Sequence, residues 1–122
     1  MLVIAIDRDS VHAGDDLSRH ASSITLDPSA TLRALFEAIR TMHYLPSISG
    51  DDASWIICAS GKQMGVLAQQ WSAPRLTVPI ESLLKQVFGD HEPRLFFKYG
   101  GQSDPDVLFS RIEAGEVLSS RY

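Results

Sequence analysis

The sequence predicts an α+β fold, in which a mixed sheet of about five strands carries helices. Two strand-like runs follow one another near the start, two more follow one another in the middle, and a fifth comes near the end. One segment with clear helical spacing and one shorter segment lie between them. Because strands that follow one another without a helix pair as hairpins, this order favours α+β over a parallel α/β sheet.

The first hairpin is predicted from residues 2–6 (LVIAI) and 22–26 (SSITL). Apolar side chains alternate in both runs, so that each strand has one inward face. The inward residues are Leu2, Ile4, Ile6, Ile24 and Leu26. Residues 7–19 between the strands are polar and include four aspartates, which predicts a long loop.

The clearest helical pattern lies in the segment DPSATLRALFEAIRTMHYL (27–45). Its apolar residues recur at i, i+3, i+4 and i+7 and form one stripe, Leu32, Leu35, Phe36 and Ile39. Thr31 or Asp27 can accept a hydrogen bond from a free backbone N–H of the first turn and so cap the helix. We expect the helix to end at residues 42–44, before a loop at 46–52.

The second hairpin is predicted in WIICASGKQMGVLAQQW (55–71). Gly61, as the first of two central turn residues, predicts a type II′ turn. That turn sets a register of opposite pairs, Ala59 with Met64, Ile57 with Val66 and Trp55 with Ala68. The other face carries Ile56, Leu67 and Cys58, with Gly65. Because both faces are apolar, we expect this hairpin to be central in the sheet and covered on both sides.

A second, shorter helix is predicted in PIESLLKQVFG (79–89), with Pro79 at its start and Gly89 just after its end. Residues 94–99 (RLFFKY) alternate as a final strand, with Leu95, Phe97 and Tyr99 against Phe96 and Lys98. Gly100-Gly101 ends this strand.

The tail after these glycines predicts a last short helix, which starts near Asp104 and ends at Gly115. Its apolar residues are Val107, Leu108, Phe109 and Ile112. The second face of the sheet would carry Val3, Ala5, Phe96 and one side of the central hairpin, and we expect the tail helix to lie against or beside it. We divide the chain into a domain of residues 1–101 and a tail helix within 102–122.

Three stretches resemble the ubiquitin-like β-grasp family: ITLDPSATLRALFEAI (24–39), IICASGKQ (56–63) and RLFFKYGG (94–101). They are similar to its second strand and main helix, its third strand and turn, and its final strand with the Gly-Gly that follows. The resemblance implies a β-grasp sheet with its main helix on one face. Conjugated members and related sulfur carriers act through a terminal Gly-Gly, whereas this chain continues for 21 residues beyond Gly101. Gly100-Gly101 would therefore need exposure by cleavage, and we interpret the pair as a turn.

Composition restricts the function. The chain has 122 residues, of which 44% are hydrophobic and 21% charged, which fits one globular domain. A net charge of −4 disfavours nucleic acid and anionic membrane as partners, because both attract basic patches. No apolar run approaches the ~20 residues that span a bilayer. The single cysteine, Cys58, fits a reducing compartment, and we expect a cytoplasmic protein.

Asp7 and Asp9 follow an apolar strand and resemble the first motif of haloacid-dehalogenase-type phosphotransferases. The scaffold of that family also needs a parallel sheet, a downstream Ser/Thr, a Lys and later acidic residues that bind Mg²⁺. Here Asp51 and Asp52 precede Lys62, which is the wrong order. We interpret the two aspartates as the exit of a strand into a turn. The four histidines lie in separate segments and Cys58 lies within a strand, so we expect neither a metal site nor a thiol nucleophile.

The expected function is therefore binding of another protein, without catalysis or a cofactor. The residues expected to take part are Trp55, Trp71, Phe96, Leu108, Phe109 and Ile112. One alternative is an immunity or antitoxin-type protein whose acidic loops bind a basic toxin. Another is metal-dependent phosphoryl transfer at Asp7 and Asp9. A homodimer is a further alternative for the partner.

Overall fold

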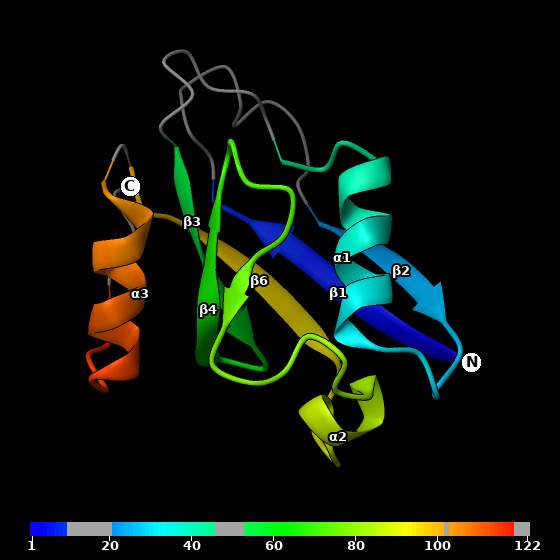
Figure 1. Ribbon diagram of the computed structural model, residues 1–122. Helices are drawn as coiled ribbons and strands as arrows, with labels where there is room; N and C mark the ends of the chain where they lie inside the picture. Colours follow the sequence, from blue (N-terminus) through cyan, green and yellow to red (C-terminus); the bar gives the residue numbers. More distant parts are fainter. Residues whose placement is uncertain (10–20, 46–52, 102, 119–122) are drawn as a thin grey trace.

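The computed structural model describes residues 1–9, 21–45, 53–101 and 103–118 (Figure 1). Within these ranges the elements are β1 (Leu2–Arg8), β2 (Ser22–Leu26), α1 (Leu32–Thr41), β3 (Ser54–Ala59), β4 (Lys62–Ala68), β5 (Arg75–Leu76), α2 (Leu84–Phe88), β6 (Arg94–Tyr99) and α3 (Pro105–Glu113). They form one six-stranded sheet with the order β2-β1-β6-β3-β4-β5. The predicted α+β class is confirmed. Most of the acidic loops of the antitoxin-type alternative, residues 10–20 and 46–52, lies outside the described residues.

The sheet is mixed because its last long strand is inserted between the two hairpins. β1 pairs antiparallel with β2, as the sequence predicts, and Ile4 lies opposite Ile24. β6 pairs parallel with β1 and antiparallel with β3. The additional strand, β5, has only two residues and pairs with β4. A run this short has no alternating pattern to reveal it, which is why the sequence predicts about five strands and not six.

The predicted register of the second hairpin is wrong. Ser60 and Gly61 are the central turn residues, with φ of 48° and 87°, so the turn has the type I′ pattern in place of the type II′ pattern. Ala59 therefore pairs with Lys62. A β-bulge follows, and the pairs beyond it are Ile57 with Gly65, Ile56 with Val66 and Trp55 with Leu67. The Ser60 hydroxyl donates to the Glu92 carbonyl at 2.8 Å, which supports this turn.

Gly65 is required by the close approach of β5. A Cβ atom at this position would lie 2.2 Å from the backbone oxygen of Arg75. No side chain fits into that space, so glycine allows β5 to lie along β4.

The main core lies between α1, α2 and one face of the sheet (Figure 1). α1 buries the predicted stripe, Leu32, Leu35, Phe36 and Ile39, and its N-cap is Thr31, whose side chain accepts from the Ala34 N–H at 3.3 Å. The strands contribute buried residues that include Ile4, Ile6, Ile24, Trp55, Ile57, Met64, Leu95, Phe97 and Tyr99.

α2 begins at Leu84, later than the predicted start at Pro79. The carbonyls of Ile80 and Ser82 accept hydrogen bonds from the N–H groups of Arg33 and Leu32 at 2.9 and 3.0 Å. The first turn of α1 has no partners of its own for these N–H groups. The segment before α2 satisfies them. It forms a turn at residues 80–81, closed by the bond from the Ser82 N–H to the Pro79 carbonyl at 2.9 Å, and the helix begins only after it.

α3 lies on the opposite face of the sheet, beside β3 and β4 (Figure 1). Its Leu108, Phe109 and Ile112 are buried in a second cluster, which we call the α3 cluster and which also contains Ile56, Cys58, Val66 and Leu118. The predicted cap at Asp104 is present, because its side chain accepts from the Asp106 N–H at 2.9 Å. Val107, which the sequence groups with the apolar contact residues, points outward and is 54% exposed.

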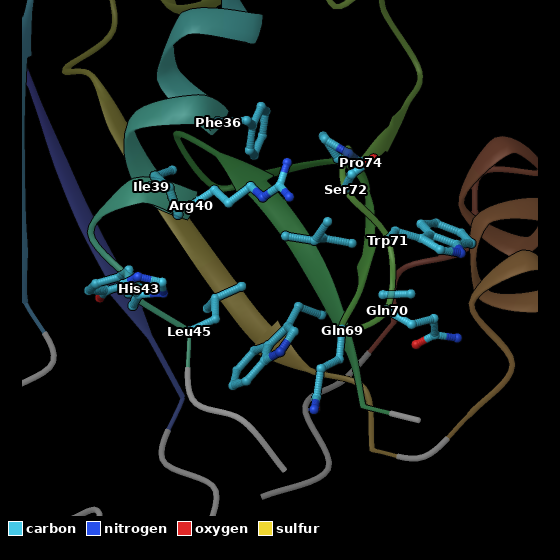
Figure 2. A pocket seen from close by; sticks show the side chains of 14 residues that line it. Phe36, Ile39, Arg40, His43, Leu45, Gln69, Gln70, Trp71, Ser72 and Pro74 are labelled. Atoms are coloured by element: carbon cyan, nitrogen blue, oxygen red, sulfur yellow. The ribbon is translucent and has the colours of Figure 1, made fainter. Parts of the chain in front are cut away.

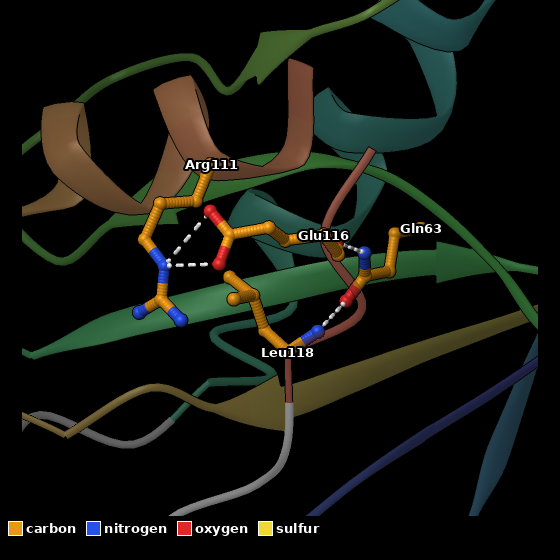
Figure 3. Close-up of polar contacts among 4 residues, drawn as sticks. All are labelled: Gln63, Arg111, Glu116 and Leu118. Carbon is orange, nitrogen blue, oxygen red and sulfur yellow. Dashed lines mark hydrogen bonds and ion pairs between the residues drawn. The ribbon is translucent and has the colours of Figure 1, made fainter. Parts of the chain in front are cut away.

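The segment after α3 is held to β4 by one side chain, Gln63 (Figure 3). Its amide nitrogen donates to the Glu116 carbonyl and its amide oxygen accepts from the Leu118 N–H, both at 2.6 Å. Arg111 of α3 pairs with the Glu116 carboxylate at 3.3 Å. The tail therefore packs along the sheet as far as Leu118, which is 5% exposed.

The face of the sheet that α3 covers over β3 and β4 is exposed over β1 and β2. Val3, Ala5, Ser23 and Thr25 are exposed there, and Val3 is 56% exposed. Apart from this valine, the uncovered part carries small or polar side chains. The expected apolar surface is therefore concentrated where α3 covers it. None of the helices in the described ranges has the length and apolar character to cross a membrane.

Candidate functional site

Asp7 and Asp9 have backbone partners. The Asp7 carboxylate accepts from the Arg8 N–H at 2.8 Å. The Asp9 carboxylate accepts from the Tyr99 N–H at 2.9 Å, and the Asp9 N–H donates to the Phe97 carbonyl at 3.0 Å. Asp9 thus extends the β1–β6 pairing past the end of β1. Across the described ranges, no three His, Cys, Asp or Glu side chains are grouped so that they could hold a metal ion.

Cys58 is buried within the α3 cluster. Burial raises the pKa of its thiol, an effect that Lys98 opposes and Asp9 reinforces. A raised pKa keeps the sulfur as the weakly nucleophilic thiol at neutral pH. Of the four histidines, His43 and His91 are described, whereas His12 and His20 lie outside the described residues.

Gly100 and Gly101 connect β6 to the tail as part of the sheet. The Gly100 N–H donates to the Ser54 carbonyl at 2.7 Å, and the Ser54 N–H donates to the Gly101 carbonyl at 3.0 Å. A Cβ on Gly100 would lie 3.1 Å from the Ser54 oxygen. In the folded chain the pair is a hydrogen-bonded connection from which the backbone continues to α3.

The six residues predicted for protein binding do not form one exposed surface. Trp55 is 1% exposed and lies in the main core, with its ring centroid 5.1 Å from that of Tyr99. Trp71 and Phe96 are half-buried against the α3 cluster. The remaining three, Leu108, Phe109 and Ile112, are buried in that cluster. Most of the apolar surface of these six residues is therefore buried by packing within the chain.

A pocket of about 310 Å³ lies between the end of α1 and the segment 69–74 that leads from β4 toward β5 (Figure 2). We call it the α1 pocket. The residues that line it are Phe36, Ile39, Arg40, His43, Tyr44, Leu45, Trp55, Leu67, Ala68, Gln69, Gln70, Trp71, Ser72 and Pro74. A shallower concavity lies on the outer side of α3, around Val107 and Arg111.

The polar side chains that line the α1 pocket are either basic or uncharged. Arg40 and His43 come from the end of α1, and Gln69, Gln70 and Ser72 come from the opposite segment. None of the fourteen lining residues is acidic. The Trp71 indole is directed toward α3, so this side chain connects the pocket rim to the α3 cluster (Figure 2).

His43 has a left-handed backbone, with φ of 50°. Its N–H donates to the Arg40 carbonyl at 3.1 Å, and the Tyr44 N–H donates to the Ile39 carbonyl at 3.3 Å. These two bonds form a Schellman motif, in which glycine is the usual residue at the left-handed position. A side chain there costs about 1–2 kcal/mol relative to a right-handed backbone. The fold therefore keeps an imidazole at the pocket rim against its backbone preference.

Tyr44 lies next to His43 and lines the same pocket. Burial, and then the nearby Asp7 carboxylate, raise the pKa of its phenol to about 12, with Arg8 opposing them. Its ring centroid lies 6.2 Å from that of Phe97. The phenol is therefore neutral at physiological pH, and its position is supported by the main core.

Comparison with known proteins found no family model and no curated sequence that matches this chain. Of the residues that line the α1 pocket, the sequence identifies Trp55 and Trp71 but not Arg40 and His43. The available signal was the end of α1, where His43 occupies the position at which a helix commonly ends in glycine. The other residues of the opposite wall, Gln69, Gln70, Ser72 and Pro74, gave no signal because they form a wall only through the pairing of β3 with β4.

Proposed function

We propose that this chain is a β-grasp-type domain that binds another protein and has no catalysis of its own. The strand order supports the β-grasp assignment. The final long strand lies between two hairpins, and α1 covers one face, as the resemblance of residues 24–39, 56–63 and 94–101 implies. The backbone partners of Asp7 and Asp9 support their interpretation as strand-end residues.

The observation that carries the binding proposal is the α1 pocket. It combines an apolar base with polar side chains from two separate elements at its rim, which is the usual character of a binding site. The strained His43 lies at this rim, and backbone strain is commonly retained where function requires it. The outer surface of α3 has less apolar area for binding a partner, because the large apolar side chains of this helix face the sheet.

Site-specific photo-cross-linking tests the proposal. A photoreactive amino acid at Ser72, on the pocket rim, should give a discrete protein adduct in extract from the source organism, and excess unmodified chain should compete with it. The same amino acid at Thr25, which is exposed on the other face of the sheet, is the matched control. No adduct at Ser72, or equal adducts at both positions, would contradict a binding role for the pocket.

A further inference from the structure

We propose that the α1 pocket binds a carboxylate of an acidic peptide segment. This inference rests on the protein-binding function proposed above and specifies the chemistry of the partner. The chain has a net charge of −4, yet among the described residues that line the pocket the only formally charged or basic side chains are Arg40 and His43.

Arg40 is placed to receive an anion. It is exposed in the last turn of α1, and in the described part of the chain the ion pairs involve Arg33, Arg75 and Arg111, not Arg40. A guanidinium can hold a carboxylate through two parallel hydrogen bonds, which gives both affinity and orientation. Arg40 extends across the pocket mouth beneath Phe36 and above Leu45 in Figure 2.

The opposite wall and the base suit a peptide. Gln70 and Ser72 are exposed on that wall and carry amide and hydroxyl groups that can bond to a peptide backbone. Phe36, Ile39 and Leu67 supply apolar surface at the base. A volume of about 310 Å³ is at the lower limit of ligand pockets, enough for one large side chain and its neighbours but not for a folded element.

A structural explanation exists for the same two side chains. Basic side chains are favoured near the C-terminal end of a helix by its dipole, and this alone could account for Arg40 and His43. That explanation predicts an effect on stability only. It also does not require a left-handed histidine, because glycine would form the same Schellman motif with less strain. Binding and stability must therefore be measured separately.

The test is a titration of the ¹⁵N-labelled full chain with a blocked peptide, Gly-Leu-Glu-Phe-Glu-Gly, followed by NMR. Saturable shifts should occur at Arg40, His43 and Ser72. The matched peptide with Gln in place of both Glu residues should bind at least tenfold more weakly. N-acetylglutamate amide is the third probe, and it should also bind at least tenfold more weakly than the acidic peptide.

Two variants and one control complete the test. Arg40→Gln should weaken binding of the acidic peptide at least tenfold, and His43→Gly should weaken it severalfold while its melting temperature stays the same or rises. Arg33→Gln is the control, because Arg33 is an exposed arginine of the same helix outside the pocket, paired with Glu81. It should bind the peptide as the unaltered chain does.

The outcomes separate this inference from the proposed function. No localised shifts, equal binding of the two peptides, or unchanged binding by Arg40→Gln would overturn the inference. Equal affinity for N-acetylglutamate amide would also overturn it and assign the pocket to small carboxylates. If the Ser72 adduct forms but the acidic peptide is not preferred, the protein-binding function stands and only its carboxylate chemistry fails.

Discussion

Truncation of Phe109 tests whether α3 is part of the core or a detachable cover. The ring is 5% exposed, so Phe109→Ala removes a buried aromatic side chain almost completely. It also removes the stacking of the Arg75 guanidinium, which lies 4.6 Å from the ring centroid. Phe→Ala substitutions in cores cost about 3–5 kcal/mol. Because Phe109 lies on a peripheral helix that can partly close the gap, we expect about 3 kcal/mol.

The assay is urea unfolding followed by tryptophan fluorescence. Trp55 lies in the main core and Trp71 packs on the α3 cluster, so the signal reports both faces of the sheet. With a urea slope of about 2 kcal/mol per M, a loss of about 3 kcal/mol lowers the midpoint by about 1.5 M. The loss of about 3 kcal/mol is a large part of the 5–15 kcal/mol that typically stabilises a domain.

Val107→Ala is the matched control on the same helix. Val107 is 54% exposed, and exposed substitutions usually change stability by less than about 0.5 kcal/mol. If Phe109→Ala fell within about 1 kcal/mol of this control, α3 would be only loosely docked. The surface beneath it would then become a candidate for partner binding beside the α1 pocket.

Three further predictions concern the sheet and the pocket. Gly65→Ala should destabilise the chain by about 1–3 kcal/mol in chemical denaturation, because the Arg75 oxygen must move to admit a Cβ atom; an unchanged midpoint would contradict the close contact. Changing Asp7 and Asp9 together to Asn should lower stability by less than about 1 kcal/mol, since an amide oxygen still accepts the same N–H groups; loss of a Mg²⁺-dependent phosphatase activity would refute our interpretation. Tyr44 should titrate near a pKa of about 12 by ultraviolet absorbance, and, because this value is raised above the usual 10, stability should decrease as the pH rises from 10 through 12. Tyr44→Phe should remove that decrease.

Elements with strong periodicity were predictable from the sequence. The stripe of α1 has four apolar residues on one helical face, and these side chains are removed from water only when that face is buried. β1 and β2 alternate in step, so that pairing Ile4 with Ile24 places the apolar side chains of both strands on one side. In these segments local preference and tertiary packing agree.

The register of β3 and β4 could not be predicted because it depends on one turn. Gly61 tolerates a left-handed backbone in either turn type, and the decision rests on Ser60, whose hydroxyl and N–H bond to the segment 92–94. These contacts connect residues more than thirty positions apart. The α1 pocket has the same origin, since its walls at residues 36–45 and 69–74 meet only after the sheet forms.

The parallel pairing of β1 with β6 has a consequence for how the chain reaches this fold. Each hairpin closes through short-range contacts, whereas Asp7 meets Phe96 only when nearly the whole domain is present. The entropy lost on closing such a long loop must precede the contacts that compensate for it, and folds with distant pairings assemble slowly. During synthesis, β6 is the last of the six strands to leave the ribosome, although it lies in the middle of the sheet between β1 and β3. Until then β1 and β3 each have an unpaired edge, which makes the nascent chain vulnerable to aggregation.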